Sequence, residues 1–351
     1  MTKQIQNSAD DSISVQSGRD TNITTGATPE QVKALVEGAV HGAVALYDGK
    51  TAAISEALQR LEDFSQRVET RLGSLEGISQ HALGDPDLHY GIARAAHAYA
   101  RSGDEQVADI LTNLIASRSE QVARSRLTLT LNESVETAAV LTAEEYAALS
   151  VMFFVGNLQV SRVRDWAHFI ALLKDAVVPL LADLPQHDAS LSYLVSQRCA
   201  LHSAIGRGSL ASILRHKYTG VLSKGFDTEG DEELKQLAVK HPDVFIPCFH
   251  DVTKRQLRTL NANAWKEVCE QAGISVEDGG KLWQRFESVQ LSDEEVQQKL
   301  VGEIPQLKRL FDFWENSNAG THPLTTIGIT IGHSNLMRTW TVEADLGIWV
   351  K

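Results

Sequence analysis

Apolar residues recur every three or four positions along most of the chain after residue 28, a spacing typical of helices that bury one face. The stretch "TPEQ" predicts the first helix start, with Thr28 as the cap and Pro29 in the first turn. A heptad pattern follows and predicts one long, coiled-coil-like helix over residues 29–80. Its core positions are Val40, Val44, Tyr47, Thr51, Ile54, Leu58, Leu61, Ser65, Val68, Leu72 and Leu75.

These core positions form an apolar seam along one side of the helix. Such a seam needs a partner helix, and two kinds of partner fit the pattern. One is the same helix of another chain, giving a parallel homo-oligomer whose interface contains the apolar seam residues. A trimer is favoured because the seam mixes β-branched residues and leucines without a buried Asn. The other is a second helix of the same chain, packed as an intramolecular hairpin.

The N-terminal stretch "SISVQSGRDTNITTG", residues 12–26, has a different pattern. Short β-branched runs containing Ile13, Val15 and Ile23 surround a Gly-Arg-Asp turn, which predicts a hairpin or one rung of a β-solenoid. One rung cannot satisfy its own backbone groups, so strands from several chains would have to pair. We expect these three residues to join the oligomer interface, and the alternative is an unpaired tail.

The next part, residues 85–224, predicts a domain of helical hairpins. Residues 85–118 form an expected helix pair, with a capping box from Ser102 to Glu105 opening the second helix. Further boxes pair Thr142 with Glu145 and Ser292 with Glu295. The expected core residues are Leu111, Leu114, Leu149, Phe153, Phe169, Leu172 and Leu173.

Glycine and charge become frequent at "KGFDTEGDEE", residues 224–233, where we place a domain boundary. The predicted units are therefore 1–28, 29–80, 85–224 and a mainly helical C-terminal domain, 230–351.

Near the end of the C-terminal domain, "LTTIGITIG" alternates like a strand but also resembles the start of the last helix in winged-helix modules; we favour a helix from Thr325. We expect "DLGIWV" to be a buried strand or extended tail, and Trp340 and Trp349 to pack the end of the domain.

Composition restricts the possible partners. The chain has 33 Lys and Arg against 45 Asp and Glu, a formal charge of −12, which argues against an extended nucleic-acid surface. The three cysteines include no C-x-x-C pair, so we expect a cytoplasmic protein with neither a metal nor a cofactor. No apolar run has the length of a membrane span, although Gly38 and Gly42 have the spacing of closely packed membrane helices.

Candidate chemistry is sparse, because the common nucleotide, protease and hydrolase motifs are absent from the sequence. In "RVRDWAH", Arg162 and His168 have the R-x5-H spacing of some HEPN-type ribonucleases, but Val163 replaces the polar residue that usually follows the arginine. We interpret "RSRL" with Arg118 as a salt-bridged helix surface and "RHKY", residues 215–218, as a solvated helix end.

Several segments together resemble a known family. The "QxGRDxNI" segment, the long helix, the "DPD…YARSGD" block, "LTAEEYAALS" and the terminal "LTxxG…DLxIW" are similar to a family of uncharacterised, mostly helical bacterial proteins. The N-terminal rung resembles those of filamentous haemagglutinin-like β-helices, and the "LTxxG" ending resembles abortive-infection proteins. The resemblance implies an association with phage defence and assigns no catalytic residue.

The sequence therefore favours a mainly α, non-enzymatic, homo-oligomeric scaffold or sensor that binds a partner protein, with a role in bacterial anti-phage defence. The alternative is an abortive-infection-type effector. Such an effector would act either as a HEPN-like ribonuclease through Arg162 and His168, or as a membrane-active protein through the helix around Gly38 and Gly42.

Overall fold

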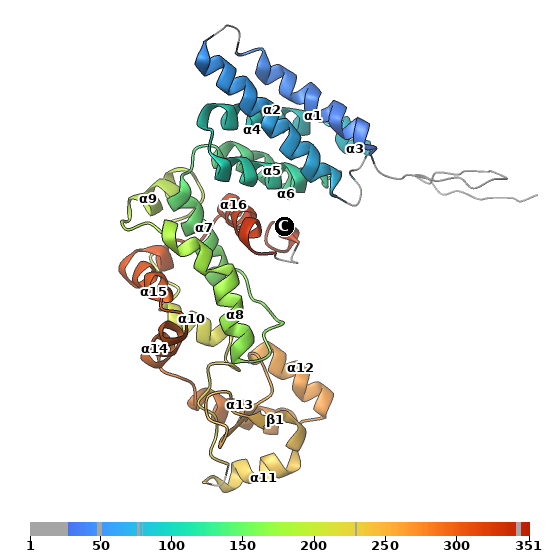
Figure 1. Ribbon diagram of the computed structural model, residues 1–351. Helices are drawn as coiled ribbons and strands as arrows, with labels where there is room; N and C mark the ends of the chain where they lie inside the picture. Colours follow the sequence, from blue (N-terminus) through green and yellow to red (C-terminus); the bar gives the residue numbers. More distant parts are fainter. Residues whose placement is uncertain (1–26, 48–50, 76–77, 79, 229, 342–344) are drawn as a thin grey trace, which may run out of the picture.

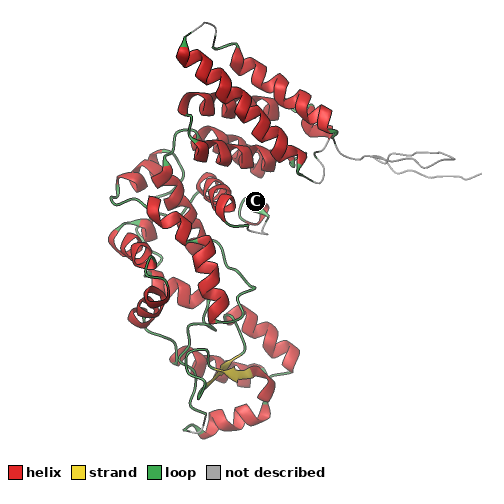
Figure 2. Cartoon of the chain, in the orientation of Figure 1, coloured by secondary structure: helices red, strands yellow, loops and turns green. Residues whose placement is uncertain are grey.

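The computed structural model describes residues 27–351 except 48–50, 76–77, 79, 229 and 342–344. Helices make up most of this part of the chain, and they are arranged in three tiers (Figures 1 and 2). A single two-stranded antiparallel sheet completes the described residues, with Phe245 opposite Leu257 and Pro247 opposite Arg255. The predicted mainly α fold class is confirmed.

The upper tier contains the first six helices, α1 (Pro29–Val44), α2 (Ala52–Gly73), α3 (Gln80–Leu83), α4 (Pro86–Ser102), α5 (Glu105–Ser119) and α6 (Arg126–Ala138). Each long helix packs against the next in the series α1, α2, α4, α5 and α6 (Figure 1). The predicted helix pair within residues 85–118 is confirmed as α4 and α5, which contact one another.

The middle tier contains α7 (Ala143–Gly156), α8 (Trp166–Ala176), the 3-10 helix η1 (Val178–Asp183), α9 (Ala189–Ser196), α10 (Leu210–Lys217), α14 (Asp293–Glu303), α15 (Leu307–Asn316), η3 (Ala319–Thr321), α16 (Thr326–Thr339) and η4 (Leu346–Ile348). The lower tier contains α11 (Glu232–Lys240), η2 (Pro242–Val244), β1 (Phe245–Pro247), β2 (Arg255–Leu257), α12 (Ala262–Ala272) and α13 (Val276–Ser288).

The long helix predicted over residues 29–80 is wrong. α1 ends at Val44, and α2 begins at Ala52 after Thr51, whose hydroxyl accepts a hydrogen bond from the Ile54 amide at 3.3 Å. The two helices pack against each other and against α4, so the intramolecular alternative holds. A heptad pattern records that a helix has an apolar seam, but it does not distinguish a partner helix in the same chain from one in another chain.

The predicted interface residues follow the same correction. Val40, Leu61, Val68 and Leu72 are buried within this chain's own core, and they are therefore not available to a coiled-coil partner. Four further core positions of the heptad pattern are partly buried, namely Tyr47, Ile54, Leu58 and Leu75. Val44 is exposed at the surface. Ile13, Val15 and Ile23 lie outside the described residues.

Most of the predicted helix starts agree with the structure. Thr28 and Gln31 form a capping box, with the Gln31 side-chain oxygen accepting from the Thr28 amide at 2.9 Å. The boxes at Thr142 and Ser292 are also formed. The box from Ser102 to Glu105 is wrong, because Gly103 adopts φ 63°, a left-handed conformation that ends α4, and Asp104 then caps α5.

Two hydrophobic cores are present among the described residues. The larger one runs through the upper and middle tiers, and the smaller one holds the lower tier between Phe226 and Phe286. The small core begins within the predicted boundary segment, 224–233. The predicted C-terminal domain, 230–351, is nevertheless split, because residues from Leu291 onward return to the larger core.

Helix α16 resolves the conflicting pattern at "LTTIGITIG". Thr325 caps it by accepting from the Gly328 amide at 3.2 Å, which confirms the predicted helix. Its first two turns are buried on all sides, so the alternation of isoleucines does not mark a strand face. Two glycines allow α16 to lie this close to its neighbours. A Cβ at Gly328 would lie 2.0 Å from the Cys199 carbonyl oxygen, and a Cβ at Gly332 would lie 2.6 Å from the Leu149 carbonyl oxygen.

The end of the chain differs from the expected strand, because residues 346–348 form the 3-10 helix η4. Trp349 packs edge-on against Phe153 at 4.9 Å between ring centroids, and Trp340 packs against Phe154 at 6.5 Å, as predicted. The described residues after α16 contain no β-hairpin, so the winged-helix expectation is not met there.

The predicted core of the helical domain is confirmed. All seven residues named for it are buried: Leu111, Leu114, Leu149, Phe153, Phe169, Leu172 and Leu173.

Candidate functional site

The sequence candidates Arg162 and His168 do not line the pocket next to them in the described part of the chain. Both side chains are exposed, and His168 lies in the first turn of α8, where Asp165 caps its amide at 2.8 Å and accepts from its ring at 3.0 Å. The neighbouring pocket is lined by Ser161, Val163 and Arg164, and neither candidate lines it. This arrangement is that of a helix cap rather than of an acid–base pair facing a substrate.

A larger cleft lies between α2, α5 and the C-terminal end of α16. Its volume is about 810 Å³. Segments far apart in the sequence form its walls, with residues 63–74 on one side, 109–113 on another and 337–341 at the end. Met337 is the one apolar side chain among the lining residues, which are otherwise charged, hydroxyl or amide side chains.

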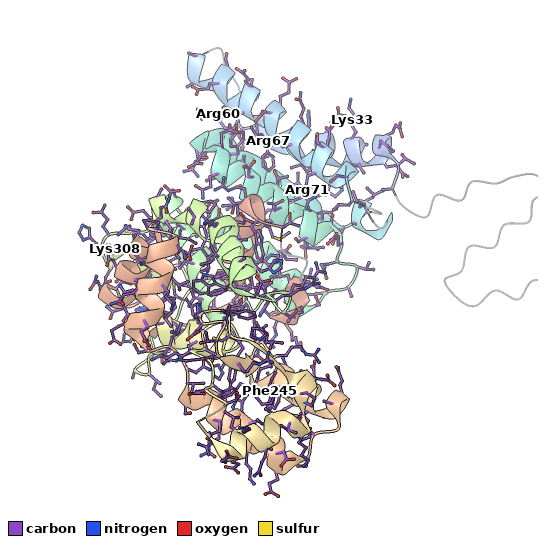
Figure 3. All side chains as sticks on the ribbon, turned by 60° about the horizontal axis from the view of Figure 1, so that its bottom comes forward. Lys33, Arg60, Arg67, Arg71, Phe245 and Lys308 are labelled. Atoms are coloured by element: carbon purple, nitrogen blue, oxygen red, sulfur yellow. The ribbon has the colours of Figure 1, made fainter. Side chains whose placement is uncertain are left out.

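Helix α2 supplies a row of arginines at this cleft. Arg60, Arg67 and Arg71 are separated by seven and four residues, and this spacing places them on one face of the helix (Figure 3). Arg60 lies outside the cleft, where it pairs with Glu56 and donates to the Ala100 carbonyl at 3.2 Å. Arg67 and Arg71 line the cleft.

Arg67 is held by carboxylates on two helices. Its guanidinium pairs with Asp63 at 2.8 Å, with Asp109 at 3.3 Å and with Glu105, and it lies 5.8 Å from the centroid of the Tyr99 ring. Partial burial opposes its charge, but Asp63 and Glu105 outweigh that effect and raise the pKa of Arg67. The Arg67 cluster therefore joins α2, α4 and α5, and its one guanidinium faces three carboxylates, a formal charge of −2.

Tyr99 completes this cluster from α4. Its hydroxyl lies 2.8 Å from a Glu105 oxygen and 3.0 Å from an Asp63 oxygen, and these two carboxylates share its one proton. Burial and these two carboxylates raise the pKa of Tyr99, so the phenol stays protonated and continues to donate.

Arg71 and Arg338 are the cations of the cleft that have no acidic partner within the described residues. The Arg71 guanidinium donates to the Ser74 hydroxyl at 3.4 Å, and the Arg338 Nε donates to the Asn335 side-chain oxygen at 3.4 Å. Thr112, which also lines the cleft, is 7% exposed, and its hydroxyl has no hydrogen-bond partner in the described part of the chain. These groups leave hydrogen-bonding capacity unused at one place.

A buried amide positions Arg338. Asn335 is fully buried, and its side-chain nitrogen donates to the Ser150 hydroxyl at 2.8 Å and to the Tyr146 carbonyl at 3.2 Å. Its oxygen also accepts from the Gln106 amide at 3.1 Å. Because Asn335 bridges α16, α7 and α5, the end of α16 is fixed relative to the cleft.

The chemistry around Arg71 and Arg338 suits recognition of negative charge, whereas the neighbouring Arg67 cluster is itself negative. Guanidinium groups donate to carboxylates and phosphates in paired hydrogen bonds, and neighbouring hydroxyl and amide groups can add donors. No histidine or cysteine belongs to the lining residues, so the described part of the cleft offers no nucleophile–base pair of the common kinds.

The structure corrects two interpretations of basic residues. Arg118 is 3% exposed and pairs with Asp85 at 2.5 Å, so it is a buried charge and not part of a helix surface. In "RHKY", Lys217 donates to the carbonyls of Val155 at 2.5 Å and Leu158 at 2.8 Å, at the end of α7. Burial, together with Arg207, lowers the pKa of Lys217 to about 8.

The described residues contain no group of three or more His, Cys, Asp or Glu side chains able to hold a metal ion. Within that part of the chain, none of the helices combines the length and the apolar character needed to cross a bilayer. Gly38 and Gly42 lie on an exposed face of α1, and apart from the adjoining residues and backbone of α1 itself, no described atom lies within 4 Å of a Cβ added at either position.

Comparison with known proteins identifies a family but no activity. A protein-family model whose description reads only ":-like" matches residues 26–350, and the chain belongs to this family. No curated protein and no solved structure matches the chain.

Proposed function

We propose that this protein is a non-enzymatic helical scaffold or sensor, and that it binds an acidic segment of a partner protein in the cleft between α2, α5 and α16. The observation that carries the proposal is the presence of Arg71 and Arg338 in one cleft, both without an acidic partner in the described residues. In a chain of net charge −12, such a local site selects negative charge that the rest of the surface repels.

The lining also favours a peptide over an enclosed small molecule. Small-molecule pockets are lined mostly by apolar and aromatic side chains, whereas here Met337 alone is apolar. An extended acidic segment could place carboxylates on Arg71 and Arg338 and use Ser74 and Asn113 for its backbone groups.

A peptide of six glutamates carrying fluorescein provides a direct test by fluorescence polarisation at low salt. The variant Arg71→Gln with Arg338→Gln should bind it at least about tenfold more weakly, because two charge-assisted hydrogen-bonding groups are lost. Affinity should also fall as salt is added, since both arginines are exposed. Arg101→Gln, at an exposed arginine of α4 outside the cleft, is the matched control. Equal binding by the double variant and the control would contradict the proposal.

The family resemblance adds a biological readout to the same experiment. If the protein acts in anti-phage defence, host cells expressing it should reduce phage plaque numbers, and the double variant should lose that reduction while the Arg101→Gln control keeps it. If the double variant protects cells as well as the wild type does, the defence activity does not depend on the cleft.

Self-association stays a prediction from the sequence. Because the apolar seam of α2 is used inside the chain, the reason for favouring a trimer is lost, and we propose that residues 12–26 carry the assembly. Light scattering should therefore give an oligomeric mass for the full chain of 38.5 kDa subunits and a monomeric mass after deletion of residues 1–26, which leaves the Thr28 cap in place. An oligomer that survives this deletion, or a monomeric full chain, would refute the prediction.

A further inference from the structure

A second pocket lies where the two hydrophobic cores meet. Its volume is about 370 Å³, and its walls come from the segment before α8 and from the lower tier around β1 and α12. In Figure 1 the lower end of α8 approaches α12 at this level. This volume is within the range of about 300–1,000 Å³ found for small-molecule sites.

The pocket has an apolar interior contributed by both cores. Val163 and Val221 are buried on the side of the larger core. Phe249 and Leu260 are partly buried against the same core, and Val268 is partly buried against the smaller core. An apolar ligand body placed here would lose its contact with water against both cores.

The walls are held in place by hydrogen bonds between the tiers. The Gln256 side-chain amide donates to the Gly220 carbonyl at 2.7 Å, and the Gly220 amide donates to the Leu260 carbonyl at 2.8 Å. The His250 ring also bonds the Val221 carbonyl at 2.8 Å. A Cβ at Gly220 would lie 1.7 Å from the Thr259 carbonyl oxygen, so glycine is required for this close approach. The pocket is therefore formed before any ligand binds.

Charged groups line the same pocket. Arg164 comes from the segment before α8 and Arg258 follows β2, and neither has an ion-pair partner in the described residues. Glu267 on α12 is the one acidic lining residue. Two positive charges and one negative charge leave the lining with a net charge of +1, which matches a singly charged anion better than a phosphate dianion.

We propose that this junction pocket binds a small monoanion with an apolar body, such as an aromatic or aliphatic carboxylate. The apolar body packs among Val163, Val221 and Phe249, and the acid group accepts hydrogen bonds from Arg164 and Arg258. Because the two arginines belong to different tiers, the bound anion connects the two cores. This site is independent of the α2, α5 and α16 cleft.

Two fluorescent dyes test the proposal on the full chain. The first, 1-anilinonaphthalene-8-sulfonate, is an aromatic monoanion, and the second, N-phenyl-1-naphthylamine, is a neutral molecule of similar shape. Arg164→Ala and Arg258→Ala should each weaken binding of the sulfonate by about tenfold and leave the neutral dye unaffected. Ala264→Trp, which fills the pocket from α12, should reduce binding of both dyes.

Controls separate this pocket from other sites. Lys266→Ala removes an equal charge from the exposed side of α12 and should change neither affinity. The cleft variant Arg71→Gln with Arg338→Gln should also bind the sulfonate normally, which separates failure here from failure of the proposed function. Sulfonate binding that is unchanged in the Arg164→Ala and Arg258→Ala variants, or that survives Ala264→Trp, would overturn the proposal. If the arginine variants lost binding of both dyes, the proposal would also be overturned, because the arginines would then not be recognising the charge of the ligand.

Discussion

Replacement of Phe169 by Ala should lower the free energy of unfolding by about 3–5 kcal/mol, the usual cost of truncating a buried aromatic side chain. Phe169 is fully buried in α8, with its ring 4.8 Å from that of Tyr218 and 6.1 Å from that of Trp166 between centroids. Removing the ring creates a cavity beneath α8 and α10, and rigid neighbouring helices can fill it only in part.

Urea denaturation followed by circular dichroism measures this effect. Ile205→Ala is a suitable control because Ile205 is 83% exposed and should change stability by less than about 0.5 kcal/mol. A Phe169→Ala protein as stable as the Ile205→Ala protein would show that the packing around α8 is not as described.

Local signals made the helices of this chain predictable. Apolar spacing and caps act over three or four residues, so Thr28 with Gln31 and Ser292 with Glu295 could be recognised from the sequence alone. The error at Ser102 has a local cause, because Gly103 ends α4 in a left-handed conformation and moves the cap to Asp104. A glycine followed by aspartate was the available signal.

The partner of each apolar face was much less predictable. Leu61 and Val68 have the heptad spacing of a coiled coil, yet they are buried in the core of the same chain, where α2 packs on α1, α4 and α5. Which helix covers a seam depends on the loop after Val44 and on the whole arrangement of the tiers, and neither is encoded in a seven-residue pattern.

The candidate cleft could not be found from the sequence for a related reason. Arg71 and Arg338 are separated by most of the chain, and no short motif connects them. Their proximity depends on the packing of α16 against α5, which itself needs Gly332 for close approach to α7 and the buried Asn335 for anchoring. Tertiary packing thus assembles the site from residues that are unremarkable in sequence.

The buried pair of Arg118 and Asp85 was missed in the same way, and it supports the other large prediction. Arg118 donates to Asp85 at 2.5 Å and to the Asn132 side-chain oxygen at 2.9 Å, while Asp85 also caps α4 through the Asp87 amide at 2.9 Å. Arg118→Met should cost about 3–5 kcal/mol near pH 7, because it leaves the Asp85 carboxylate without its cation in a largely buried site. Arg124→Met, at an exposed arginine nearby, is the matched control and should have little effect.

This cost should depend on pH in a defined direction. Burial by itself raises the pKa of Asp85, but hydrogen bonds from Arg118 and from the Asp87 and Leu88 amides outweigh it, and the pKa is lowered. The ionised carboxylate therefore stabilises the native state above about pH 3.9, the ordinary pKa of Asp, and this contribution is lost as the pH falls through the lowered native pKa. Denaturation curves should show the wild type and Arg118→Met converging in stability under acid conditions.

A second substitution distinguishes loss of the ion pair from loss of side-chain packing. Asn at position 85 keeps the helix cap but carries no charge, so Asp85→Asn combined with Arg118→Met should recover part of the stability that Arg118→Met loses at pH 7. The recovery follows because the uncompensated buried carboxylate, rather than the missing guanidinium, accounts for most of the cost. A double variant no more stable than Arg118→Met, with a cost that does not change with pH, would mean that Arg118 acts through packing and not through its charge.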